Sequence, residues 1–285
     1  MSRVLQALGL SRKHLTLPAF KRPLRFLSHR GLIGEWLLRG IPIDEATQLG
    51  LDPSEQFTFW VYPDEGIGHF LYWYGFEGWE FHTVKLFADF ARRARAIVDV
   101  GANTGVYSLL ACAVNPTAQV IGFEPVPSTY QRYLRNIALN KFEGRCHTRT
   151  EALSNFIGSS SLEVPEDLTM ARMVGNPTGN SIQVPVSTAD ALLPDDMPVD
   201  LVKIDVEGFE DKVLEGMQRT LRRWHPPIIF EVLPGGPAKA IEDVLRPLGY
   251  SFSCITENGP ESVSNLDPGV ATERNFLALA PNANV

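Results

Sequence analysis

Short apolar runs alternate with segments of helical periodicity from residue 96 onward. Four runs have the length and composition of buried strands: Ala96–Val100, Gln119–Glu124, Val199–Asp205 and Pro227–Val232. Helices are expected over 104–114, 128–140, 210–217 and 238–245, and further strands over 146–153, 250–255 and 275–280. This alternation predicts an α/β fold, in which right-handed βαβ units build a mostly parallel sheet with helices on both faces. The last two strands, joined only by a loop, predict an antiparallel hairpin at the edge of that sheet.

The first eighty residues have a different pattern. The first fifty are expected to be helical, with interruptions near Pro18, Pro23 and Pro42. Aromatic-rich stretches over 57–62 and 69–74 predict two short strands around a PDEG turn. A helical pattern then begins at Glu80. We therefore predict an N-terminal extension over residues 1–79 and a second domain over residues 80–285.

The stretch from Gly158 to Ser187 interrupts the regular alternation. It is polar and rich in glycine and proline. Long connections of this kind are usually functional or disordered. We expect an excursion on the substrate side of the fold, with short strands at its two ends.

Composition narrows the class of protein. The formal net charge of −7 argues against a general affinity for nucleic acid, whose phosphates favour a basic surface. The three cysteines are far apart in the sequence and fit buried thiols in a reducing compartment. There is no secretory signal pattern and no apolar run of transmembrane length, which indicates a cytoplasmic protein.

Positive charge is concentrated at the start of the chain. Between Met1 and Ile43 the basic residues are Arg3, Arg12, Lys13, Lys21, Arg22, Arg25, Arg30 and Arg39, against Glu35 alone. Because leucine, phenylalanine and tryptophan are interspersed, this segment suits peripheral contact with an anionic membrane or a partner. The alternative is a helical cap that packs on the acidic remainder of the chain.

Acidic residues follow the predicted strands, at the edge where ligands bind in open parallel sheets. The first loop, DVGANTG, contains two glycines that permit tight turns and close approach of a ligand. Asn103 stands where a dinucleotide site would have a glycine beside the pyrophosphate. Asp99 suits a positively charged amine, and Glu124 suits the two hydroxyls of a ribose. An amine and a ribose without a phosphate together describe S-adenosyl-L-methionine.

Several ordered motifs resemble the FkbM family of S-adenosylmethionine-dependent methyltransferases. They are VDVGANTGVYSLL, VIGFEPVPSTYQRYLRNIALN, EALSN, VDLVKIDVEGFEDKVLEGM and IIFEV, and they cover roughly Glu80 to Val232. The resemblance implies the seven-stranded, Rossmann-like class I methyltransferase sheet and O-methylation of sugars, glycans or natural products. It also implies that Asp99, Gly101, Asn103 and Gly105 hold the methionine part, that Glu124 holds the ribose, and that Glu151, Ala152 and Leu153 lie by the adenine.

Methyl transfer to a hydroxyl requires alignment of the acceptor and removal of its proton. Because side chains alternate along a strand, Lys203, Asp205 and Glu207 are expected on one side. Asp205 is the first candidate for the general base, and Glu207 and Lys203 are expected to orient it through their charges. Glu231, on the neighbouring strand, is a candidate acceptor-binding residue. A divalent metal shared by Glu231, Asp205 and Glu207 is chemically possible but is not predicted.

His82 is the remaining candidate for acceptor binding, with helix capping or a buried hydrogen bond as its alternative role. The acceptor is open as well, since a protein or a lipid-linked molecule is also compatible with the sequence. A nucleic-acid methyltransferase is disfavoured because DVEGF replaces the proline-aromatic pair that holds a flipped base. An NAD-linked oxidoreductase is disfavoured by Asn103. A non-catalytic nucleotide-binding module of the same fold is the last alternative.

Overall fold

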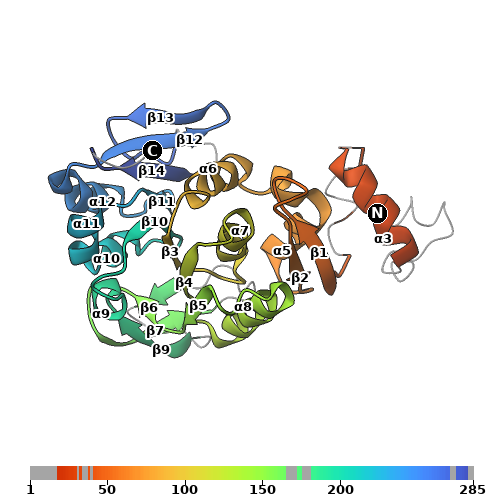
Figure 1. Cartoon of the computed structure of the whole chain (residues 1–285), viewed down its shortest axis with the longest axis horizontal. Coiled ribbons are helices and arrows are strands. Elements are labelled where there is room, and N and C mark those ends of the chain that lie inside the picture. Colours follow the sequence, from red (N-terminus) through yellow and green to blue (C-terminus); the bar gives the residue numbers. More distant parts are fainter. Residues whose placement is uncertain are drawn as a thin grey trace.

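An eight-stranded mixed sheet forms the centre of the molecule (Figure 1). In chain order its strands are β3 (Ala96–Val100), β4 (Gln119–Phe123), β5 (Cys146–Arg149), β10 (Val199–Ile204), β11 (Ile228–Glu231), β12 (Ser251–Thr256), β13 (Gly259–Val263) and β14 (Asn275–Leu279). Their spatial order is β13-β12-β14-β11-β10-β3-β4-β5. The five strands from β5 to β11 are parallel, and β14, β12 and β13 are antiparallel to their neighbours. This confirms the predicted α/β fold and adds one strand, β13, to the expected seven.

The structure is a computed structural model that describes residues 18–30, 32–33, 38, 41–164, 172–174, 181–269 and 274–281. The predicted basic segment before Pro18 lies outside these residues. So do 165–171 and 175–180 of the predicted substrate-side excursion.

Helices cover both faces of the sheet, as the alternation predicts. They are α6 (Phe81–Ala91), α7 (Val106–Val114), α8 (Pro127–Asn140), α9 (Ala189–Leu192), α10 (Glu210–Glu215), α11 (Gln218–Trp224) and α12 (Ala238–Leu245), followed by the 3-10 turn η3 (Arg246–Leu248). Neighbouring residues of β3 belong to different cores: Ile97 packs with α6 and α7, and Val98 packs with α10 to α12. Alternate side chains of a strand point to opposite faces, so each buried strand contributes to both layers.

The N-terminal part differs most from the sequence prediction. Residues Glu45–Leu49 form strand β1, which pairs antiparallel with β2 (Phe57–Val61). The predicted strand over 69–74 is wrong, because Gly66–Tyr74 forms helix α5, followed by the 3-10 turn η1 (Gly75–Gly78). Aromatic residues favour strands only weakly, and here Leu71, Tyr72 and Trp73 are buried in the core.

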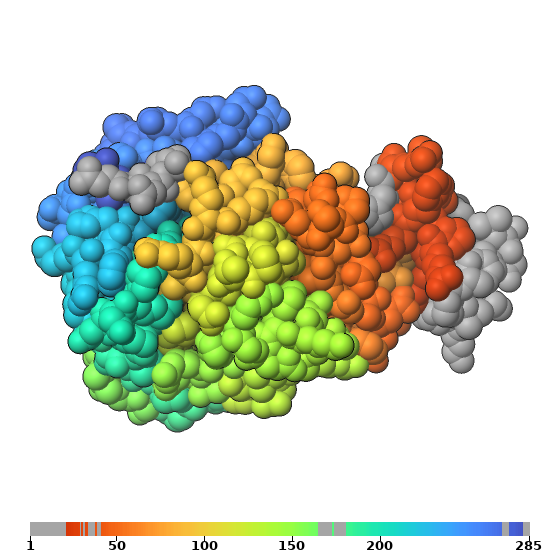
Figure 2. Space-filling view, viewed as in Figure 1, coloured from red at the N-terminus to blue at the C-terminus, as the bar shows by residue number. Residues whose placement is uncertain are grey.

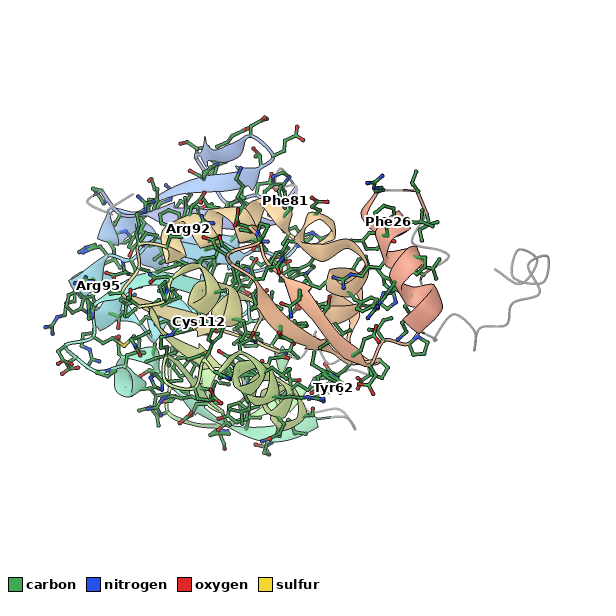
Figure 3. The ribbon with its side chains drawn as sticks, turned by 45° about the vertical axis from the view of Figure 1, so that its right-hand side comes forward. Phe26, Tyr62, Phe81, Arg92, Arg95 and Cys112 are labelled. Atoms are coloured by element: carbon green, nitrogen blue, oxygen red, sulfur yellow. The ribbon has the colours of Figure 1, made fainter. Side chains whose placement is uncertain are left out.

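Helix α3 (Pro18–His29) contains Pro23 and projects from one end of the molecule (Figure 2). It contacts α5. Phe26 lies on this helix, away from the central sheet (Figure 3).

The rest of the extension packs into the same core as the sheet. Phe57, Phe59 and Trp73 are fully buried in one apolar cluster with Phe87 of α6 and Leu109 of α7. Asn136 and Asn140 of α8 also accept hydrogen bonds from backbone N–H groups of β2, at 2.8 and 2.7 Å. The division at residue 79 stays a prediction, and the extension packs directly against the helices that follow it.

The excursion forms part of a second, smaller sheet. Its strands are β6 (Ala152–Leu153), β7 (Gly158–Glu163), β8 (Arg172–Val174) and β9 (Ser181–Ser187), in the order β6-β9-β7-β8. The single strand predicted over 146–153 is therefore two strands in different sheets. The predicted C-terminal hairpin is also modified: β12 and β14 are antiparallel neighbours, but β13 forms the edge and β14 lies inside, next to β11.

Candidate active site

A cavity of about 250 Å³ lies at the carboxyl ends of β3, β4, β10 and β11. Eleven of the predicted site residues line it: Asp99, Gly101, Asn103, Glu124, Glu151, Ala152, Leu153, Lys203, Asp205, Glu207 and Glu231. Gly105 and His82 do not line it. Because the carboxyl ends of parallel strands meet at one edge of a sheet, residues up to 132 positions apart in the sequence are brought to one cavity.

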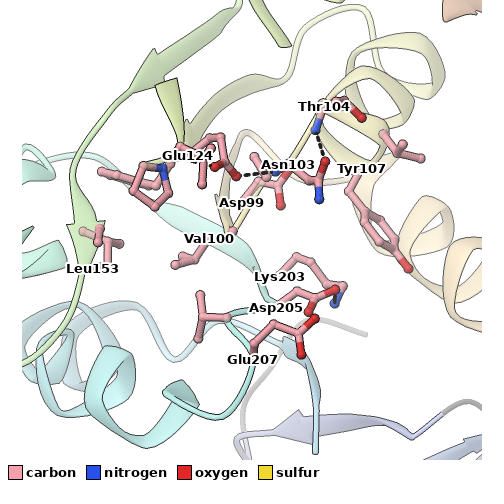
Figure 4. Close-up of a pocket in the computed structure, with 18 of the residues that line it drawn as sticks. Asp99, Val100, Asn103, Thr104, Tyr107, Glu124, Leu153, Lys203, Asp205 and Glu207 are labelled. Atoms are coloured by element: carbon pink, nitrogen blue, oxygen red, sulfur yellow. Dashed lines mark hydrogen bonds and ion pairs between the residues drawn. The ribbon is translucent and has the colours of Figure 1, made fainter. Parts of the chain in front are cut away.

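Glu124 fixes the loop between β3 and α7 (Figure 4). Its carboxylate is buried and accepts the backbone N–H of Asn103 at 2.9 Å and that of Val126 at 2.8 Å. Burial raises the pKa of Glu124 to about 7, despite these two hydrogen bonds that lower it. A carboxylate has about four acceptor sites, so two donors leave capacity for a ligand.

The two predicted glycines both have positive φ and also lie where a side chain would not fit. A Cβ at Gly101, which has φ +77°, would lie 1.8 Å from the backbone oxygen of Asp205. A Cβ at Gly105 would lie 2.3 Å from the buried ring of Tyr133. Both glycines therefore permit close packing within the protein: Gly101 between two strand-end loops, and Gly105 between a loop and α8.

Asp99 is buried beside the cavity. Its carboxylate accepts a hydrogen bond from the hydroxyl of Ser108 at 2.6 Å. Burial raises the pKa of Asp99 to about 6, while Ser108 and the nearby Lys203 lower it. The group is therefore an anion at neutral pH and is suited to bind a cationic amine.

The other side of the cavity contains Lys203, Asp205 and Glu207 (Figure 4). Lys203 has no exposed surface, and its Nζ lies 3.5 Å from the Asp205 carboxylate. Burial acts to lower the pKa of Lys203, but Asp205 and three further carboxylates raise it above its ordinary value. Strand alternation does not explain the position of Glu207, because β10 ends at Ile204 and Glu207 has φ +54°. A turn, rather than the strand, brings Glu207 to the cavity.

Glu231 completes a carboxylate cluster at the rim. Burial, followed by the charge of Asp205, raises the pKa of Glu231 to about 8. One oxygen each from Glu231, Asp205 and Glu207 lies within 4.8 Å of the others. The three could therefore hold one hard cation, although acidic clusters are common without one.

Tyr107 is a site residue that the sequence analysis missed. Its hydroxyl donates to Glu80 at 2.6 Å, and its ring lies 5.6 Å from that of Trp79, centre to centre. The Lys203 ammonium is 5.1 Å from the centre of the Tyr107 ring. Ile67, Leu162 and Met173 also line the cavity. Helical periodicity places Tyr107 on α7 but cannot show that this residue faces the strand ends.

His82 lies outside the cavity, although the preceding Glu80 lines it. The His82 ring packs edge-to-face against Phe81, with ring centres 5.4 Å apart. The position of the helix start, which the sequence indicates only to within a few residues, decides which of these side chains faces the site.

The strand order and the cavity at the carboxyl strand ends are those of the class I, Rossmann-like methyltransferase fold. A sequence profile described as the Methyltransferase FkbM domain matches residues 99–252, more than half of the chain. The protein belongs to the FkbM methyltransferase family.

Two relatives show how far the similarity extends. Methyltransferase sdnD of Sordaria araneosa is 31% identical over 192 residues, which cover 55% of this chain and 74% of the relative. Hexuronic acid methyltransferase AglP of Haloferax volcanii is 29% identical over 181 residues, covering 63% of this chain and 73% of the relative.

Solved structures are more distant. An FkbM methyltransferase from Methylobacillus flagellatus has a TM-score of 0.43 and 17% identity, over 65% of this chain and 43% of that one. The O-methyltransferase TomG from Streptomyces achromogenes, solved with S-adenosylmethionine, has a TM-score of 0.39 and 15% identity, over 70% of this chain and 79% of that one.

Proposed function

We propose that the protein transfers a methyl group from S-adenosyl-L-methionine to a hydroxyl of a sugar, a glycan or a hydroxylated natural product. One observation carries this proposal: a single cavity has two buried carboxylates, Asp99 and Glu124, on one side and a part-exposed carboxylate cluster beside a buried lysine on the other. The first side suits the cofactor, and the second suits an acceptor hydroxyl that must lose a proton.

The residues on the first side fit S-adenosyl-L-methionine. Glu124 has acceptor capacity left for ribose hydroxyls, and Asp99 offers a charge to the amino group. Ala152 and Leu153 supply an apolar wall, and the part-exposed Glu151 lies beside them. When bound, the cofactor supplies an activated methyl group on a sulfonium.

On the second side we assign proton removal to Asp205. The neighbouring Lys203 ammonium attracts the carboxylate and limits its orientation, and Glu207 is placed to accept a second hydrogen bond from the acceptor. Burial and the charge of Asp205 raise the pKa of Glu231 to about 8, so its protonated form can donate a hydrogen bond to the acceptor. The Trp79 ring suits the C–H face of a sugar.

One relative supports a sugar as the acceptor, but not its charge. One of the similar proteins is named as a hexuronic acid methyltransferase. A carboxylate-rich rim disfavours a second anion close to Asp205, so neutral hydroxyls are the acceptors we favour for this chain.

The direct test has two stages. Calorimetric titration of S-adenosylhomocysteine into the wild type should give micromolar binding that is lost in Glu124→Ala. In Arg145→Ala, a control immediately before β5 and outside the cavity lining, binding should persist. Methyl transfer from labelled S-adenosylmethionine to neutral methyl hexosides and to the corresponding hexuronic acids, with and without EDTA, then identifies the acceptor and any metal requirement. A folded wild type without affinity for the cofactor product would overturn the proposal.

We also propose that α3 contacts an anionic membrane surface, where a lipid-linked acceptor would be presented. Arg22, Phe26 and Arg30 follow one another at four-residue spacing and are exposed, and Phe26 is 56% exposed. The guanidinium of Arg30 lies 4.4 Å from the centre of the Phe26 ring. Two other basic residues of α3 face the protein: Lys21 pairs with Glu45, and Arg25 lies over Tyr72. No helix among the described residues is long and apolar enough to cross a membrane.

A further inference from the structure

Glu65 connects the N-terminal extension to the loop between β3 and α7. Only 3% of its surface is exposed, and its Oε1 accepts a hydrogen bond from the hydroxyl of Thr104 at 2.5 Å. Gly68 leaves room for the carboxyl group, since a Cβ there would lie 3.0 Å from the carboxyl carbon. A buried carboxylate from outside the methyltransferase motifs therefore contacts the loop that lines the cavity.

Thr104 has all of its polar groups engaged. Its backbone N–H donates to the side-chain oxygen of Asn103 at 2.8 Å, and its carbonyl accepts from Asn136 of α8 at 3.0 Å. Its hydroxyl donates to Glu65, as described. Asn103 is in turn held by Glu124 and has φ +52°, a left-handed conformation that asparagine adopts more readily than most other non-glycine residues. The loop thus depends on side chains from the residue after β4, from α8 and from the extension.

A purely local role for Glu65 does not account for its geometry. Glu65 occupies the N-cap position of α5, where a side-chain acceptor usually binds the first N–H groups of the helix. Its side chain makes no such cap hydrogen bond. The carboxyl group is directed to Thr104, and its second oxygen is buried without a hydrogen-bond partner. Burial of an oxygen without a hydrogen bond costs free energy, and a side chain that capped the helix would not have this cost.

We infer that Glu65 is a positioning residue for cofactor binding, which acts by holding Thr104 and thereby the loop from Gly101 to Gly105. The inference rests on the proposed function, because it assigns this loop to S-adenosyl-L-methionine. It makes the extension a part of the binding site. Ile67, in the first turn of α5, lines the cavity and is consistent with this arrangement.

The test compares two variants and one control by calorimetry with S-adenosylhomocysteine. Thr104→Val and Glu65→Ala remove the two partners of the contact. Thr220→Val is the control, because Thr220 is also buried and donates its hydroxyl to a carboxylate, that of Asp190, at 2.8 Å, but does not line the cavity. We expect Thr104→Val and Glu65→Ala to weaken binding about tenfold, and Thr220→Val to lower the Tm without a change in Kd.

The Glu65→Gln variant distinguishes a role in positioning Thr104 from a role in stabilising the fold alone. The amide keeps an oxygen for the Thr104 hydroxyl, so affinity should return to within about twofold of the wild type, while the Thr104→Val/Glu65→Gln double variant should resemble Thr104→Val alone. Equal affinity of Glu65→Ala and the wild type would overturn the inference. Absence of binding by the wild type would instead refute the proposed function, so the two failures are distinguishable.

Discussion

The Nζ of Lys203 lies 3.5 Å from the carboxylate of Asp205, although the lysine has no exposed surface. A buried ammonium is stable only where opposite charges compensate for the lost hydration. Asp205, Glu80, Glu231 and Asp99 provide that compensation and raise the pKa of Lys203 above its ordinary value against the effect of burial. The lysine therefore stays charged and constrains the carboxylate that we assign to proton removal.

Asp205→Asn should abolish most of the methyl transfer and leave cofactor affinity nearly unchanged. Loss of a general base typically lowers kcat by about 10²- to 10⁴-fold. The measurement is kcat together with the Kd for S-adenosylhomocysteine. Asp200→Asn is the control, because Asp200 lies on the same strand, pairs with Arg95 and does not line the cavity. If both variants retained full kcat, Asp205 would not be the base.

Affinity for S-adenosylhomocysteine should decrease when the pH falls below 6. The pKa of Asp99 is raised to about 6 by burial, with Asp205 adding to the rise and Ser108 and Lys203 opposing it. The amino group of the ligand binds the ionised form, so protonation competes with the ligand, by up to about tenfold in Kd for each pH unit below 6. Calorimetry between pH 5 and 8 measures this. The Asp99→Asn variant should bind weakly and should lose less affinity than the wild type between pH 6 and 5, and an acid-insensitive wild type would contradict the prediction.

Glu65→Gln should stabilise the protein more at pH 8 than at pH 5. Burial raises the pKa of Glu65 to about 7, and the charge of Asp64 adds slightly to the rise. Thr104, the Tyr62 backbone and Arg132 lower this pKa by a smaller amount. Because the pKa of Glu65 is higher in the folded than in the unfolded chain, its protonated form favours folding. This contribution to the free energy of unfolding is fully present below the pKa of the unfolded chain and is lost as the pH rises through 7. The glutamine has no such loss, so the difference between variant and wild type should grow by about 2 kcal/mol from pH 5 to 8. Urea unfolding at both pH values measures it, and parallel pH profiles would refute it.

Gly101→Ala should prevent normal folding, whereas Gly208→Ala should be tolerated. Both glycines have positive φ, +77° and +97°. A Cβ at Gly101 would lie 1.8 Å from a backbone oxygen, but one at Gly208 would have no atom within 4 Å. Backbone strain alone costs about 1 kcal/mol, so the loss at Gly208 should stay near that value and the loss at Gly101 should exceed about 3 kcal/mol. Soluble yield and Tm distinguish the two, and similar values would show that the β3 and β10 loops can separate.

The full chain should co-sediment with vesicles of phosphatidylglycerol but not with vesicles of phosphatidylcholine. An arginine near an anionic surface contributes about 1 kcal/mol, so Arg30→Gln should weaken binding about fivefold. Phe26→Ser should weaken it as well. Phe156→Ser is the control, since Phe156 is also exposed but lies far from α3 in the sequence. Equal sedimentation with both lipids would remove the proposed membrane contact.

The sequence by itself determined the α/β alternation and most of the cavity. Apolar runs and helical periodicity are local signals, so β3, β4, β10, β11 and α12 fall where they are predicted. Acidic residues after these strands necessarily meet, because parallel strands have their carboxyl ends at one edge. Asp99, Glu124 and Asp205 were therefore identifiable from the chain alone.

Only the tertiary structure decided which partners those residues have. Helix α5 replaces a predicted strand because packing against the core outweighs the weak strand preference of aromatic residues. The absence of a side chain at Gly105 leaves room for the Tyr133 ring. Thr104 contacts Glu65, 39 positions earlier in the chain. Tyr107 reaches Glu80, and Glu207 reaches the rim through a turn. Such contacts join segments with no periodic relation, so they follow from how the layers pack and not from any local pattern.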